Sequence, residues 1–159
     1  MNMHDKLRPK LIGDKYQVPK APFNLTLSER RQVAALLSSL HVLDGYSSNI
    51  SRCVTLDDRW ISGMKSHNCH VFMQDLLLPV FRGVLDEKVL EPLVELSNYF
   101  KKLCSKTLDM DILEQMEKDI AITLCKLERI FILAFFDVMV HLTIHLAIEA
   151  KLAGSVPYW

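Results

Sequence analysis

The chain has 159 residues, half of them hydrophobic, which fits one domain long enough to bury a core. Lys plus Arg and Asp plus Glu both number 19, so the formal net charge is zero. Domains that bind nucleic-acid duplexes usually carry a basic excess that neutralises phosphates, so this balance argues against direct nucleic-acid binding by this chain alone.

The N-terminal residues 1–24 are punctuated by proline and glycine and show no apolar period, which predicts an irregular arm or linker. They also lack the apolar stretch of a secretory signal, so we expect a non-secreted, intracellular protein. In such a compartment the four cysteines stay reduced.

Thr26 followed by Glu29 has the spacing of a capping box and predicts the start of a helix. Apolar residues then recur at helical spacing (Val33, Leu36, Leu37 and Leu40). Beyond a Ser/Asn-rich loop, two short β-prone runs at 52–56 and 59–62 flank Asp57-Asp58. This pattern predicts a small β-hairpin.

Helical periodicity returns near Ser66, and Pro79 is expected to kink or divide that helix. Further helices are predicted over residues 86–105, from an N-cap at Asp109, and over about 135–152. The expected fold is mainly α: a compact bundle of about four to five helices with one small β-hairpin and an irregular N-terminal arm. The arm covers residues 1–24, the helical domain 25–153 and a loose tail 154–159.

The apolar stretch from Ile130 to Ile148 has nearly the length of a membrane span. However, Asp137, His141 and His145 recur every four residues and therefore share one helical face. Because a carboxylate and two imidazoles are costly in hydrocarbon, the stretch predicts a buried helix, and we expect no membrane association.

Two pairs of histidines have the spacing of metal ligands on helices. His67 and His70 are three residues apart, and His141 and His145 are four apart, so four imidazoles could close a zinc site. No paired CxxC or CxxH element accompanies them. The favoured interpretation is therefore that they are hydrogen-bonded or interfacial helix residues and that the chain holds no cofactor; a small metal-binding protein is the alternative.

The sequence supports a catalytic site less than it supports a metal site. Cys69 lies between His67 and His70, so on a helix it points away from at least one of them, which does not suit a thiol nucleophile with its base. Acidic residues near this segment (Asp44, Asp57, Asp58 and Asp75) could serve two-metal chemistry, but the first three are better explained as turn residues. We expect no catalytic residues in this chain.

The segment Asp44–Gln74, DGYSSNISRCVTLDDRWISGMKSHNCHVFMQ, resembles the domain of unknown function that follows the catalytic core in plant CACTA-type (En/Spm-like) transposases. The similarity runs from about Ala21 to Ala153. It continues through ELSNYF at 95–100, LCSK at 103–106 and LCKLERIF at 124–131, and is strongest at AFFDVMVHL, 134–142, and EAKL, 149–152.

This resemblance implies a domain without catalytic residues, since the DDE-type core of such proteins lies upstream, and it implies a nuclear location. The chain departs from the family where Asn68 replaces an acid and where Ile132-Leu133 replace two prolines. Loss of the prolines would let the last two helices fuse. The leading hypothesis is an accessory domain that packs against, or oligomerises, a transposase. A weak nucleic-acid-binding module is a second alternative.

Overall fold

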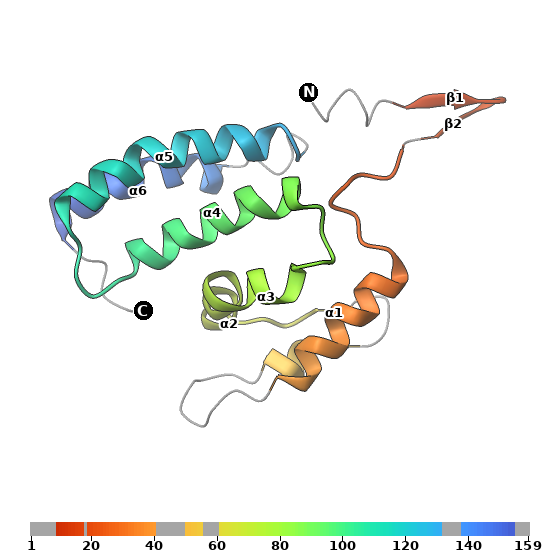
Figure 1. Ribbon diagram of the computed structural model, residues 1–159, viewed down its shortest axis with the longest axis horizontal. Coiled ribbons are helices and arrows are strands. Elements are labelled where there is room, and N and C mark those ends of the chain that lie inside the picture. The colour runs from red at the N-terminus through yellow and green to blue at the C-terminus, as the bar shows by residue number, and fades with distance from the viewer. Residues whose placement is uncertain (1–8, 18, 41–49, 56–60, 132–137, 155–159) are drawn as a thin grey trace.

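The structure, a computed structural model, describes residues 9–17, 19–40, 50–55, 61–131 and 138–154 (Figure 1). Within the last range the side chains of Val138, Met139 and His141 lie outside the description. The described chain is mainly α-helical with one two-stranded antiparallel hairpin, which confirms the expected fold class. No helix among the described residues is both long and apolar enough to cross a membrane.

The hairpin lies in the N-terminal arm, where the sequence analysis predicted irregular structure. Strands β1 (Lys10–Ile12) and β2 (Lys15–Gln17) pair with Leu11 opposite Tyr16. The connecting Gly13 has φ +64°, a left-handed conformation that glycine adopts without steric cost. All six strand residues are exposed, and the hairpin projects from the helices (Figure 1). The prediction of an irregular arm was therefore wrong for residues 10–17.

Helix α1 (Leu27–Ser39) begins at the predicted capping box. The Thr26 side chain accepts a hydrogen bond from the Glu29 backbone, and the Glu29 carboxylate accepts one from the Thr26 backbone. These bonds hold the pKa of Glu29 below its usual value. Val33 and Leu37 are buried as expected, but Leu36 is exposed, and Ala34 is buried in its place on the inner face.

The predicted second hairpin is only partly present. Ile50–Cys53 forms a 3-10 turn with Ile50 buried in a cluster with α1, so Arg52 and Cys53 do not begin a strand. Val54 and Ile61 form a single antiparallel bridge, and the Ser62 N–H donates to the Cys53 carbonyl at 2.8 Å. The two runs therefore meet, whereas the turn at Asp57-Asp58 lies outside the described residues.

The segment 66–81 is divided, as the proline predicted. Helix α2 (Ser66–Val71) leads into a π-helical turn (Phe72–Leu76) and then α3 (Leu77–Phe81). A proline ring clashes with the carbonyl four residues earlier, which for Pro79 is that of Asp75, inside the π-helical turn. The wider turn thus lies where the proline disturbs regular helical bonding.

Three long helices complete the chain: α4 (Glu87–Leu103), α5 (Met110–Glu128) and α6 (Val138–Ala153). Asp86 and Asp109 cap α4 and α5 by accepting backbone N–H bonds at 2.9 Å. Helix α5 ends at Glu128 and a turn follows, so α5 and α6 are separate helices, and the expected fusion after loss of the prolines does not occur.

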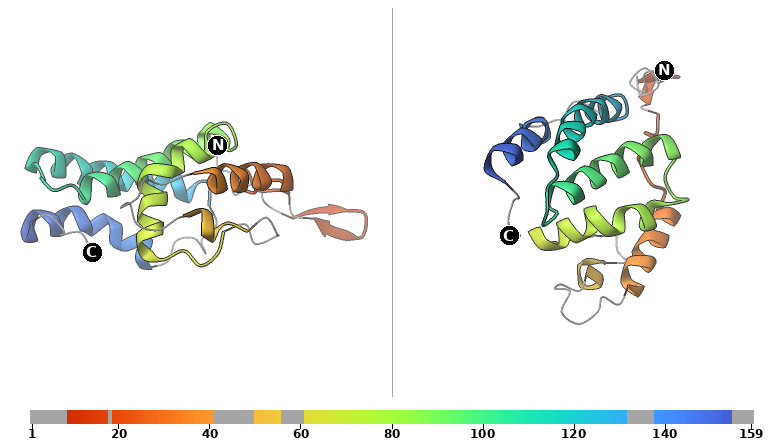
Figure 2. Two further views of the ribbon diagram at one scale, coloured as in Figure 1. Left: turned by 90° about the horizontal axis from the view of Figure 1, so that it is seen from below. Right: turned by 60° about the vertical axis from the view of Figure 1, so that its left-hand side comes forward.

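The helices follow one another in space from α6 through α5 and α4 to the α2–α3 segment and α1 (Figure 2, right). Two hydrophobic clusters hold them. The larger cluster joins α4, α5 and α6, and its buried members are Tyr99, Leu103, Leu113, Met116, Ile120, Leu124, Leu127, Ala147 and Ala150. The smaller cluster joins α1, the 3-10 turn and α3 through Val33, Leu37, Ile50 and Val80.

Helix α4 connects the two clusters through polar contacts as well as packing. The Ser97 hydroxyl donates to the Met73 carbonyl, and the Lys101 ammonium pairs with Asp75 at 2.7 Å. The N-terminal segment also reaches the larger cluster, because the Phe23 ring stacks on Phe131 with centroids 4.9 Å apart.

Candidate functional site

The Ser66–His70 segment, which gathers the most reactive side chains of the sequence, forms the first turns of α2. His67, Cys69 and His70 are exposed there, whereas Asn68 is buried with 3% of its surface accessible. The Asn68 amide donates to the Cys53 sulfur at 3.4 Å, and the Cys53 thiol donates to the Gly63 carbonyl at 3.8 Å. The inward face of the segment therefore holds α2 against the 3-10 turn.

The second histidine pair lies on α6. His145 is exposed, and the His141 side chain lies outside the described residues. Within the described part of the chain, no three His, Cys, Asp or Glu side chains are grouped as metal ligands would be. The four-histidine site requires His141, so it stays a prediction.

Of the acidic residues considered for catalysis, Asp75 pairs with Lys101, and the other three (Asp44, Asp57 and Asp58) lie outside the described residues. This ion pair links the π-helical turn to α4. The Cys69 thiol is exposed on the outer side of α2.

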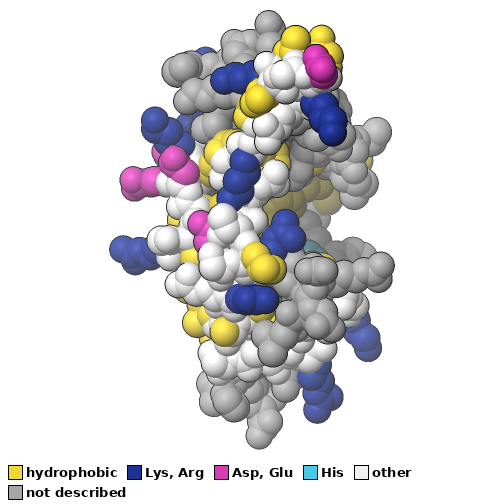
Figure 3. Space-filling model, turned by 90° about the vertical axis from the view of Figure 1, so that its right-hand side faces the viewer, with side chains coloured by type: hydrophobic (Ala, Val, Ile, Leu, Met, Phe, Trp, Pro, Cys, Tyr) yellow, Lys and Arg dark blue, Asp and Glu magenta, His cyan; other side chains and the backbone are white. Residues whose placement is uncertain are grey.

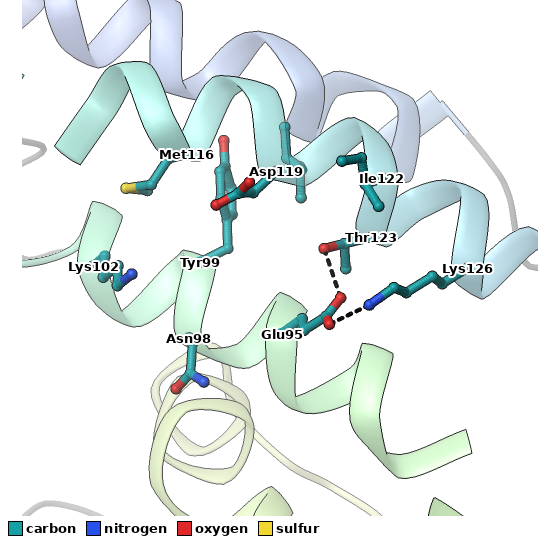
Figure 4. Close-up of a pocket in the computed structure, with 10 residues that line it drawn as sticks. Glu95, Asn98, Tyr99, Lys102, Met116, Asp119, Ile122, Thr123 and Lys126 are labelled. Atoms are coloured by element: carbon teal, nitrogen blue, oxygen red, sulfur yellow. Dashed lines mark hydrogen bonds and ion pairs between the residues drawn. The ribbon is translucent and has the colours of Figure 1, made fainter. Parts of the chain in front are cut away.

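A groove between α4 and α5 has a volume of about 390 Å3. Figure 4 shows its polar side, where Glu95 on α4 faces Thr123 and Lys126 on α5. The Thr123 hydroxyl donates to Glu95 at 3.0 Å, and Lys126 pairs with both Glu95 and Glu91. These pairs raise the pKa of Lys126, and the hydrogen bond that its ammonium donates to Glu95 is the largest cause.

The floor of the groove is formed by Tyr99, Met116 and Ile120 of the larger cluster. The Tyr99 hydroxyl donates to the Thr143 carbonyl of α6 at 2.7 Å, so this one side chain contacts α5 and α6 at once. Burial raises the pKa of Tyr99 from 10.0 to about 12.

The sequence analysis missed this groove. Glu95 and Lys126 are 31 residues apart and lie outside the apolar seams of their helices, so neither belongs to a local motif. The available signal was that Glu91 and Glu95 are four residues apart on one face of α4 and lie opposite a lysine on the next helix. That pattern predicts ion pairs between two packed helices and does not predict a catalytic or binding site.

The surface of α5 and α6 is unusually apolar for a solvated face. Six large apolar side chains of these two helices are exposed among the described residues (Met110, Ile112, Ile122, Leu142, Ile148 and Leu152). Single exposed apolar residues are normal on a protein surface. Here they occur on both α5 and α6, and several exposed apolar side chains are typical of a surface that packs against another molecule.

The face that includes the β-hairpin differs in charge from the surface of α5 and α6. Figure 3 shows the side that includes the β-hairpin, where Lys and Arg side chains are scattered among white and yellow side chains and acidic side chains are fewer. The expectation that the chain alone does not bind nucleic acid stays a prediction.

Residues 103–159 match the sequence model of a family described as a domain of unknown function (DUF4218). The matched stretch begins at the last residue of α4 and contains α5 and α6, about a third of the chain. Neither the curated proteins nor the solved structures contain a match to this chain.

Proposed function

We propose that this chain is a non-catalytic helical accessory domain of a plant CACTA transposase-like protein and that it acts by packing against the catalytic part of a nuclear transposase. The family match at residues 103–159 supports the proposal, because it includes the segments 134–142 and 149–152, where the resemblance to these transposases is strongest.

The observation that carries the packing role is the apolar surface of α5 and α6. Ile122 on α5 lines the α4–α5 groove and is 59% exposed. Leu152 on α6 is 85% exposed. Burying one such side chain in an interface contributes roughly 1.5–3 kcal/mol. A partner that covers several of them gains enough free energy for stable binding.

Co-purification with the catalytic core of a CACTA transposase tests the proposal. We expect the two to elute together from a sizing column. Ile122→Ser is expected to weaken the complex at least tenfold. The matched control is Ile12→Ser, which changes the same residue type at 61% exposure in the β-hairpin and should leave binding unchanged.

Two results would contradict the proposal. One is a wild-type chain that remains a monomer, binds no hydrophobic dye and does not elute with the core. The other is equal weakening by Ile122→Ser and Ile12→Ser, since that would mean that the α5–α6 surface has no special role.

A further inference from the structure

Helix α6 carries large apolar side chains on its outer face as well as small residues on its inner face, although it lies at the edge of the molecule. Its inner face packs Thr143, Ala147 and Ala150 toward α5. Its outer face carries Leu142, Ile148 and Leu152, all exposed. Figure 2 (right) shows α5 on one side of α6 and none of the described helices on its other side. Exposed large apolar side chains on an outer helix are typical of a surface that another molecule covers.

The exposed residues form a seam with regular spacing. Leu142, His145, Glu149 and Leu152 are separated by three, four and three residues, which is the a/d pattern of two consecutive heptads. All four are exposed, and together they occupy the face opposite Thr143 and Ala147. The seam therefore has the geometry by which one helix packs along another.

The order of the four residues is complementary to itself. If two copies of α6 lie antiparallel with residue 147 at the centre, Leu142 faces Leu152 of the second copy, and His145 faces Glu149 of the second copy. An imidazole N–H can then donate to a carboxylate on both sides of the two-fold axis. In a parallel pair, by contrast, Glu149 would face Glu149, which costs free energy by like-charge repulsion.

We infer that the outer face of α6 is a self-association surface, on which the α6 helix of a second copy of this chain packs antiparallel. The contacts are the Leu142–Leu152 and His145–Glu149 pairs between the two copies. The inference rests on the proposed packing function and names the partner of one of its surfaces. A two-fold contact of this kind is isologous, so a single stripe serves both copies. The seam is short, so the dissociation constant should be on the order of 0.1 mM, as for a small transient interface.

Sedimentation equilibrium over a concentration series that brackets this value tests the inference. We expect a reversible monomer–dimer equilibrium for the wild-type chain. Leu142→Asp should abolish the dimer in this range. Leu78→Asp is the matched control, because Leu78 on α3 has nearly the same exposure, 45% against 44%, and its substitution should leave the equilibrium unchanged.

Charge exchange tests the antiparallel register. His145→Glu places two carboxylates together, and Glu149→Lys places an ammonium against the imidazole, so each should weaken the dimer about three- to tenfold. The double variant should recover the wild-type constant within about threefold, because the new carboxylate at position 145 would then face the new ammonium at position 149 of the second copy. In a parallel dimer the double variant would place like charges together and would not recover, which would overturn the register.

A wild-type chain that stays monomeric throughout the series overturns the inference. The proposed function would still stand if that monomer binds the catalytic core through Ile122. A chain that dimerises through α6 but fails to bind the core gives the opposite result, so the two proposals can fail separately.

Discussion

The two hydrophobic clusters differ in how the chain builds them. The larger cluster is made by three helices of 16 to 19 residues that pack along their lengths. The smaller is made by one helix of 13 residues, a 3-10 turn and a five-residue helix, and it buries four residues instead of nine. Long helices form many contacts with few residues in turns, so we expect the C-terminal half to be the more stable part.

The two clusters also differ in which sequence features they contain. The described part of the segment with the most reactive side chains, Asp44–Gln74, packs on the smaller cluster through Ile50, and its buried Asn68 donates to Cys53. The family match and the exposed apolar seam belong to the larger one. The family match and the candidate interaction surface thus lie in the helical C-terminal half, away from the His- and Cys-rich segment.

Shortening a buried side chain in each cluster should give the largest difference between the two halves. Leu127 and Leu37 are both fully buried, one in each cluster, so either change to alanine should cost about 2–5 kcal/mol locally. We expect Leu127→Ala to reduce protection from hydrogen exchange throughout the chain. Leu37→Ala should reduce protection in α1 and α3 while α5 and α6 keep theirs. Equal loss of protection in both halves for both variants would contradict the comparison.

Tyr99→Phe should have a smaller effect that is specific to the larger cluster. Loss of the hydrogen bond to the Thr143 carbonyl should lower the free energy of unfolding by about 1 kcal/mol at neutral pH. Urea unfolding of the variant beside the wild-type chain measures the difference, and an unchanged midpoint would mean that this bond does not stabilise the cluster.

The same tyrosine gives the wild-type chain a dependence on alkaline pH. The pKa of Tyr99 is raised in the folded state, so the folded protein binds more protons than the unfolded one above pH 10. The associated stability is complete below pH 10 and is lost as the pH rises toward 12. The urea midpoint should therefore fall further between neutral pH and about pH 11 for the wild-type chain than for Tyr99→Phe. An equal fall in both would contradict this role.

Much of the helical architecture follows from the sequence alone. The capping box at Thr26, the helical range 86–105 and the cap at Asp109 each predicted an element that the structure contains. Local hydrogen bonds and periodicity determine these features, so a single sequence is enough to show them.

The errors arose where tertiary packing or a short turn decides the structure. The hairpin at residues 10–17 depends on the two-residue Gly13-Asp14 loop, a hairpin signal that was interpreted as part of a linker. Ile50 is buried in the smaller cluster at the start of a 3-10 turn, a tertiary contact that the local pattern does not show. The Glu95–Lys126 pairing and the contact from Tyr99 to α6 join distant segments, which periodicity cannot show.

The central claim is that α5 and α6, rather than the His- and Cys-rich segment, form the partner surface, and two cysteines test it directly. Cys125 on α5 and Cys69 on α2 are both exposed thiols, one in each half. Their alkylation rates should be measured with and without a saturating amount of the transposase catalytic core. We expect at least a fivefold slowing at Cys125, which is about one helical turn from Ile122, and no change at Cys69. Slowing at Cys69 with Cys125 unchanged would contradict the account.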